Sequence, residues 1–211
     1  MIIDIFHDTV CPWCRIGKTS LKHALDQWPS QDVTLRFRTF FLNDSIPPEG
    51  YAYQEYMRAK FEGRATLEQL YQGPRRAGAN YGLTFNFEKI TTTPNTLLSH
   101  CLIAITPDDH KETMIDALYN AYFEDGRNIG DQHVLHEIGT EQGLTQEQVV
   151  AGLENVQLQR DIKAEAQWAQ QIGVTGVPLF IFDQQYALSG AQPPEAFLQV
   201  FETLESEAQA R

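Results

Sequence analysis

The sequence predicts an α/β fold in which a long helical segment interrupts a small sheet domain. Three observations carry this prediction. Residues 2–42 read as strand, helix and strand, residues 52–170 carry helical periodicity, and strand patterning returns at residues 179–189 ahead of a last helix. The expected order of elements is therefore β-α-β, a helical insertion, and β-β-α.

The first unit begins with a short apolar strand at residues 2–6. Apolar side chains then recur at helical spacing from Ile16 to Trp28, and Pro29 ends that helix. Apolar and polar residues alternate at 33–38, which predicts a strand that continues to Leu42. A right-handed crossover places these two strands parallel in one sheet.

The segment 52–170 is too long for a simple crossover and predicts an inserted helical subdomain. Pro94 opens one expected helix, and residues 114–123 form the apolar face of the next. Thr145 with Gln148 has the spacing of a capping box for another helix.

After Gly173 the pattern returns to strands. Leu179 to Phe182 is a continuous apolar strand, a turn follows, residues 186–189 form its partner, and Pro193-Pro194 opens the last helix. This order describes a thioredoxin fold split by a helical subdomain. The predicted thioredoxin-like domain is discontinuous, with residues 1–51 and 171–211, and residues 52–170 form the insertion.

Cys11-Pro12-Trp13-Cys14 lies between the first strand and the first helix. Pro12 suits the first helical position, where its missing N–H would be unpaired anyway, and this makes Cys11 the N-cap. Free backbone N–H groups and the positive end of the helix dipole favour a thiolate at Cys11. We therefore expect Cys11 to be the nucleophile and Cys14, one turn further, to be the thiol that releases a mixed disulfide.

Two other roles for this motif are less favoured. A zinc site needs four ligands, and the remaining cysteine, Cys101, has no second thiol near it in sequence, so no metal is expected. A structural disulfide suits secreted proteins, whereas residues 1–10 do not resemble a secretion signal. The expected location is the cytoplasm.

Charge and hydropathy exclude two classes of partner. The formal net charge is −12, which repels phosphate backbones and anionic membrane surfaces, so we expect no nucleic acid. No apolar stretch approaches the ~20 residues that a membrane-spanning helix needs, so no membrane is expected.

A second candidate segment is Val177-Pro178, at the start of the strand beginning at Leu179. Proline cannot donate a ladder hydrogen bond, which suits a strand's first position. The thioredoxin fold places a cis-proline loop beside the reactive thiol, and residues 175–178 enter the correct strand to be that loop. The Val177 backbone then binds substrate as an added strand, next to Pro12 and Trp13.

Asp8 lies three residues before Cys11 and has two interpretations of equal weight. It is either a partly buried carboxylate that accepts the proton of Cys14, or a turn residue facing solvent. His7 alternates onto the opposite face. His100 adjoins Cys101, which is interpreted as a lone core cysteine. Five aromatic residues are interpreted as packing residues: Tyr53, Tyr56, Tyr81, Phe85 and Phe87.

Segments along the whole chain resemble the cytoplasmic DsbA-like thioredoxin-fold proteins of the FrnE type. They are residues 8–18 (DTVCPWCRIGK), 41–50 (FLNDSIPPEG), 94–97 (PNTL), 173–180 (GVTGVPLF) and 190–193 (GAQP). The resemblance implies a protein disulfide oxidoreductase with Cys11 and Cys14 as the redox pair and Pro178 as the cis-proline. Arg15 departs from the aromatic residue that usually follows the second cysteine.

A related branch remains the alternative. It resembles the kappa-class glutathione transferases and the 2-hydroxychromene-2-carboxylate isomerases, which bind glutathione and usually have serine where this chain has Cys11. A third possibility is a thiol-containing binding module without turnover. The presence of both thiols favours dithiol exchange with a thiol or disulfide substrate, without a separate cofactor, and glutathione is the alternative partner.

Overall fold

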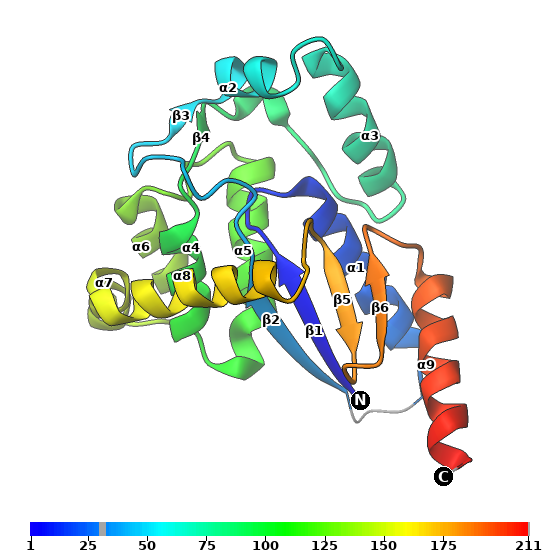
Figure 1. The fold of residues 1–211 in the computed structure, drawn as a ribbon. Coiled ribbons are helices and arrows are strands. Elements are labelled where there is room, and N and C mark those ends of the chain that lie inside the picture. The colour runs from blue at the N-terminus through cyan, green and yellow to red at the C-terminus, as the bar shows by residue number, and fades with distance from the viewer. Residues whose placement is uncertain (30–32, 211) are drawn as a thin grey trace.

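A four-stranded sheet with the order β2-β1-β5-β6 lies at the centre of the protein in the computed structural model, which describes residues 1–29 and 33–210 (Figure 1). Strand β1 (Ile2–His7) pairs in parallel with β2 (Thr34–Thr39) and antiparallel with β5 (Leu179–Phe182). Strand β6 (Tyr186–Ser189) completes the sheet as the hairpin partner of β5. The predicted α/β thioredoxin fold is confirmed.

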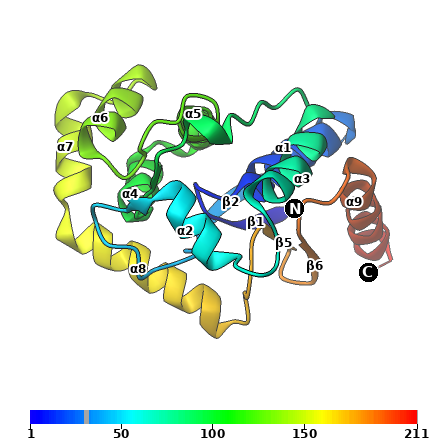
Figure 2. The ribbon, with the colours of Figure 1, turned by 90° about the horizontal axis from the view of Figure 1, so that it is seen from above.

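Helices cover both faces of this sheet. Helix α1 (Pro12–Gln27) and α9 (Pro194–Gln209) pack on one face, where Ile3 and Ile5 of β1 join Phe197 and Phe201 in a buried cluster. Helix α8 (Val156–Gln171) lies across the opposite face (Figure 2). Phe6, which alternates with Ile5, packs there among buried residues that include Ala169 of α8.

The segment between β2 and β5 is mainly helical. Before α8 it contains α2 (Tyr53–Lys60), α3 (Leu67–Ala79), α4 (Leu97–Ile105), α5 (Lys111–Phe123), α6 (Gln132–Glu141) and α7 (Gln146–Glu154), with 3-10 turns at Phe87–Lys89 (η1) and Asp108–His110 (η2). Thr145 and Gln148 form the predicted capping box of α7.

The expectation of helical structure throughout this segment is wrong at two places. Strands β3 (Tyr51–Ala52) and β4 (Thr92–Thr93) pair antiparallel. Gly50 permits this pairing, because its φ is +77° and a Cβ there would lie 2.7 Å from the Thr93 carbonyl oxygen. Two-residue strands have no periodicity, so the sequence pattern did not predict them.

The strand predicted to continue to Leu42 ends instead at Thr39. The backbone then crosses the carboxyl end of β1, where the Phe40 N–H donates to the His7 carbonyl at 3.0 Å. The Leu42 N–H donates to Asp8 Oδ2 at 2.8 Å. The Asp8 carboxylate thus accepts a backbone hydrogen bond that a neighbouring strand would otherwise accept. Residues 40–42 therefore lie over the end of β1.

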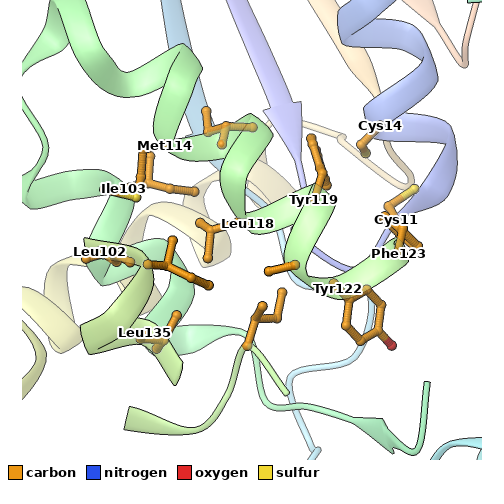
Figure 3. Close-up of a cluster of buried hydrophobic side chains, with 14 of the residues drawn as sticks. Cys11, Cys14, Leu102, Ile103, Met114, Leu118, Tyr119, Tyr122, Phe123 and Leu135 are labelled. Atoms are coloured by element: carbon orange, nitrogen blue, oxygen red, sulfur yellow. The ribbon is translucent and has the colours of Figure 1, made fainter. Parts of the chain in front are cut away.

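The largest buried cluster joins the two thiols to the helical segment (Figure 3). Cys11 and Cys14 belong to it together with Tyr119, Tyr122 and Phe123 of α5. The helical segment and the sheet domain therefore share one core next to the cysteine pair. Among the described residues, no helix is both long and apolar enough to cross a membrane.

Candidate active site

Cys11 caps the N-terminus of α1, as the sequence predicts. Its backbone is extended, with φ −94° and ψ 111°, Pro12 takes the first helical position, and the Cys14 N–H donates to the Cys11 carbonyl at 3.1 Å. The Cys11 side chain makes no capping hydrogen bond to the helix. Instead, its Sγ donates to the Val177 carbonyl oxygen at 3.7 Å.

The Val177-Pro178 peptide bond is cis, which confirms the prediction from the sequence. Pro178 is buried, and Val177 presents its carbonyl to the Cys11 thiol. Gly17 of α1 lets this loop approach the helix, because a Cβ there would lie only 3.0 Å from Pro178 Cγ. The loop predicted to bind substrate therefore lies against the predicted nucleophile.

Both thiols are buried, and they differ in whether they border a cavity. Cys14 is 2% exposed and does not line the cavity that Cys11 lines. Burial raises the pKa of the Cys14 thiol well above its usual value, and the neighbouring Cys11 and the Asp8 carboxylate raise it further, while the Asp8 backbone opposes them. Cys14 is thus held as a thiol until a proton acceptor becomes available.

Asp8 is a buried carboxylate and not a solvent-facing turn residue. It is 1% exposed, and its Oδ2 accepts the Leu42 N–H at 2.8 Å. Its Oδ1 has no hydrogen-bond partner and lies 3.6 Å from Nε2 of His100, which is also without one. A buried carboxylate with a free oxygen is suited to exchange a proton.

His100 is the residue that sequence reasoning missed, since it was considered only as a neighbour of Cys101. It is 2% exposed and lies between Asp8 and His7, with ring centroids of the two histidines 5.3 Å apart. His7 Nδ1 is 3.2 Å from the Tyr119 hydroxyl. The one available signal was a polar residue within the apolar run of α4. Cys101 is fully buried, and burial raises its pKa to about 11, as suits a core cysteine.

His7 gives a prediction for stability against pH. Burial, followed by the charges of His100 and Lys18, lowers its pKa well below 6.5. Below about pH 6.5 the unfolded chain therefore takes up a proton that the folded protein does not. The free energy of unfolding therefore falls as the pH falls. We expect His7→Gln to lessen this decrease by roughly 1.4 kcal/mol per pH unit between pH 6 and 5. Urea unfolding at several pH values measures the free energy of unfolding, and His110→Gln, at an exposed histidine, is the control. Equal slopes of this free energy against pH in the two variants would contradict the prediction.

An aromatic cavity of about 370 Å³ adjoins Cys11, and its wall includes Asp8, Pro12, Trp13 and Val177. Three of the aromatic residues interpreted as packing residues also line it: Tyr53, Tyr56 and Phe87. Tyr53 and Phe87 are buried core residues, so the packing interpretation holds for them, and all three residues border the cavity in addition. For the other two it is confirmed, since Tyr81 donates to Ser20 Oγ and Phe85 packs between Phe87 and Phe123.

Arg15 does not line the cavity. Its guanidinium donates to the Thr84 carbonyl at 2.7 Å and to Asn120 Oδ1 at 2.6 Å, and it pairs with Glu124. It therefore connects α1 to α5 away from the thiols. In the described part of the chain, no three His, Cys, Asp or Glu side chains converge on a metal position.

Comparison with protein families decides the relationship, because the model of the DSBA-like thioredoxin domain matches residues 2–202. The chain belongs to this family. The crystal structure of a probable DsbA oxidoreductase from Streptomyces coelicolor is 30% identical, with a TM-score of 0.89 over 98% of this chain and 91% of that one. The uncharacterized protein YwbO of Bacillus subtilis is 23% identical over 92% of each chain.

Two further structures show likeness of fold at lower identity. The cytosolic disulfide reductase DsbM from Pseudomonas aeruginosa, solved with GSH, is 17% identical with a TM-score of 0.68, covering 98% of this chain and 100% of that one. A 2-hydroxychromene-2-carboxylate isomerase is 12% identical with a TM-score of 0.72, covering 100% and 97%. The DsbA-like fold is thus shared by disulfide enzymes and an isomerase.

Proposed function

We propose that this protein is a thiol-disulfide oxidoreductase that acts by dithiol-disulfide exchange through Cys11 and Cys14. The observation that carries the proposal is the asymmetry of the two thiols. Cys11 lines a cavity at a helix N-terminus, whereas Cys14 is buried behind it with a raised pKa. One thiol is therefore placed to meet a substrate and the other to resolve the product.

The reaction proceeds in two exchanges. The Cys11 thiolate attacks one sulfur of a substrate disulfide, which forms a mixed disulfide and releases the first substrate thiol. Cys14 then loses its proton and attacks Cys11 Sγ, which forms the Cys11–Cys14 disulfide and releases the second thiol. Two electrons pass from the cysteine pair to the substrate, and the reverse sequence oxidises a dithiol.

Asp8 is the proposed acceptor for the proton of Cys14. Its unpartnered Oδ1 faces His100 inside the protein, and its carboxylate lies close enough to raise the pKa of the Cys14 thiol. The loop at Val177-Pro178 positions the Cys11 sulfur through the Val177 carbonyl, and Pro12 and Trp13 contact the substrate from the cavity wall.

Glutathione-dependent isomerisation or transfer is the second candidate. The fold shared with a reductase solved with GSH and with an isomerase favours it. However, among the described residues that line the cavity beside Cys11, Lys60 is the one cationic side chain and Asp8 the one carboxylate, so little positive charge is available for the carboxylates of glutathione. The cytoplasmic location and the FrnE-type assignment remain part of the proposal, supported by the resemblance and by the cytosolic reductase of similar fold.

Two assays of the wild type and Cys14→Ala separate these functions. In the reduction of a disulfide substrate driven by an external dithiol, we expect Cys14→Ala to lose most of its turnover, because the mixed disulfide is no longer resolved internally. In glutathione conjugation and isomerisation assays we expect little activity from the wild type. The buried Cys101→Ala serves as the control for loss of a thiol. Glutathione-dependent turnover that survives in Cys14→Ala would replace the oxidoreductase proposal with the second candidate.

A further inference from the structure

One wall of the cavity beside Cys11 is a stack of nearly parallel aromatic rings. Tyr53 and Tyr71 have ring centroids 6.4 Å apart with planes at 14°, and Tyr71 and Phe87 are 4.6 Å apart at 13°. Tyr122 and Phe123 of α5 also line the cavity. Because the ring faces pack against one another within the stack, this wall presents ring edges. Ring edges suit an aromatic substrate, because edge-to-face contacts add to the free energy of burying its area.

Charge disfavours oxidised glutathione as the substrate, and limited access to Cys11 disfavours a protein disulfide. Glutathione carries two carboxylates and one ammonium group, whereas Lys60 is the one cation among the described lining residues. Cys11 is 4% exposed, so a substrate must enter the cavity to reach its sulfur. A volume of about 370 Å³ lies near the lower end of the range for small-molecule sites.

We propose that the substrate is the disulfide of a small aromatic thiol. This inference rests on the proposed disulfide exchange and names its substrate class. Cys11 attacks the substrate S–S bond and an aromatic thiolate leaves; Cys14 then closes the enzyme disulfide and the second aromatic thiol leaves. The two cysteines supply both electrons and both protons, and an external dithiol restores them. Aromatic thiolates are good leaving groups because their thiols are acidic.

The test compares four disulfides in single-turnover reactions with the reduced protein. They are bis(4-hydroxyphenyl) disulfide, bis(2-hydroxyethyl) disulfide, oxidised glutathione and insulin. Each rate constant is divided by that of N-acetylcysteine with the same disulfide, which removes differences in intrinsic reactivity. We expect the normalised value for the aromatic disulfide to exceed the other three by at least about tenfold.

Matched variants locate this preference in the cavity. We expect Phe87→Leu to reduce the aromatic preference by about 2- to 10-fold, the range of one lost contact between aromatic rings. Phe85→Leu is the control, because Phe85 belongs to the same ring stack without lining the cavity.

A binding measurement on the wild type does not depend on how the variants fold. We expect 2-naphthol, which has no thiol, to slow alkylation of Cys11 by iodoacetamide, and S-methylglutathione to have no such effect. Protection by S-methylglutathione alone, or a preference for oxidised glutathione or insulin, would overturn the aromatic substrate while leaving disulfide exchange intact. Normalised rates near one for all four disulfides would instead refute the proposed function.

Discussion

Replacing Cys11 with serine abolishes disulfide exchange, whereas Cys14→Ser still attacks a disulfide and stops at the mixed disulfide. This is the expected result, because Cys11 lines the cavity at a helix N-terminus and Cys14 is 2% exposed behind it. We expect exchange by Cys11→Ser to fall to the rate without protein. Intact-mass spectrometry after addition of bis(2-hydroxyethyl) disulfide measures both effects, since only Cys14→Ser should gain one adduct, located at Cys11.

The chain provides its own control for this experiment. Cys101 is fully buried in α4, and burial raises its pKa to about 11, so Cys101→Ser removes a thiol without touching the cavity. We expect Cys101→Ser to exchange disulfides at the wild-type rate and to form no lasting adduct. Equal adduct formation in Cys11→Ser and Cys14→Ser would contradict the assignment of nucleophile and resolving thiol.

The sequence predicted those parts of the fold that depend on neighbouring residues. The N-cap at Cys11 follows from Pro12, and the capping box at Thr145 follows from Gln148. The short apolar run at residues 2–6 predicted β1. By contrast, β3 and β4 pair residues about 40 positions apart, and β2 ends at Thr39 because Asp8 bonds the backbone of Leu42. These features depend on contacts across the fold, which no local pattern records.

The same division holds for the candidate site. The Cys11–Cys14 spacing and the cis-proline loop are local motifs, and the sequence placed both correctly in the fold. His100 lies in an apolar helix, and nothing near it in sequence indicates that it faces Asp8 at 3.6 Å. Tyr53 and Phe87 were interpreted as packing residues because aromatic residues usually are. Both border the same cavity as Cys11, and this proximity depends on contacts across the fold.

Asp8→Asn gives the second large effect, on the step in which Cys14 resolves the mixed disulfide. We expect this variant to release the substrate thiol from a preformed mixed disulfide about 10²-fold more slowly near pH 7, because it loses the group that accepts the Cys14 proton. The rate should then rise with pH as hydroxide takes over that role. Single-turnover thiol release between pH 6 and 10 measures both effects.

The sign of the effect separates proton transfer from electrostatics. The Asp8 carboxylate raises the pKa of the Cys14 thiol, so removing its charge lowers that pKa and provides more thiolate at a given pH. If charge were the whole role of Asp8, Asp8→Asn would therefore release thiol faster than the wild type.

Asp116→Asn, which removes an exposed carboxylate paired with Lys18, is the matched control and should leave the rate unchanged. His100→Gln removes the ring that faces Asp8 Oδ1 but keeps the carboxylate, so we expect a smaller decrease than in Asp8→Asn. A faster Asp8→Asn variant would show that a buried negative charge retards Cys14 and that the proton leaves by another route.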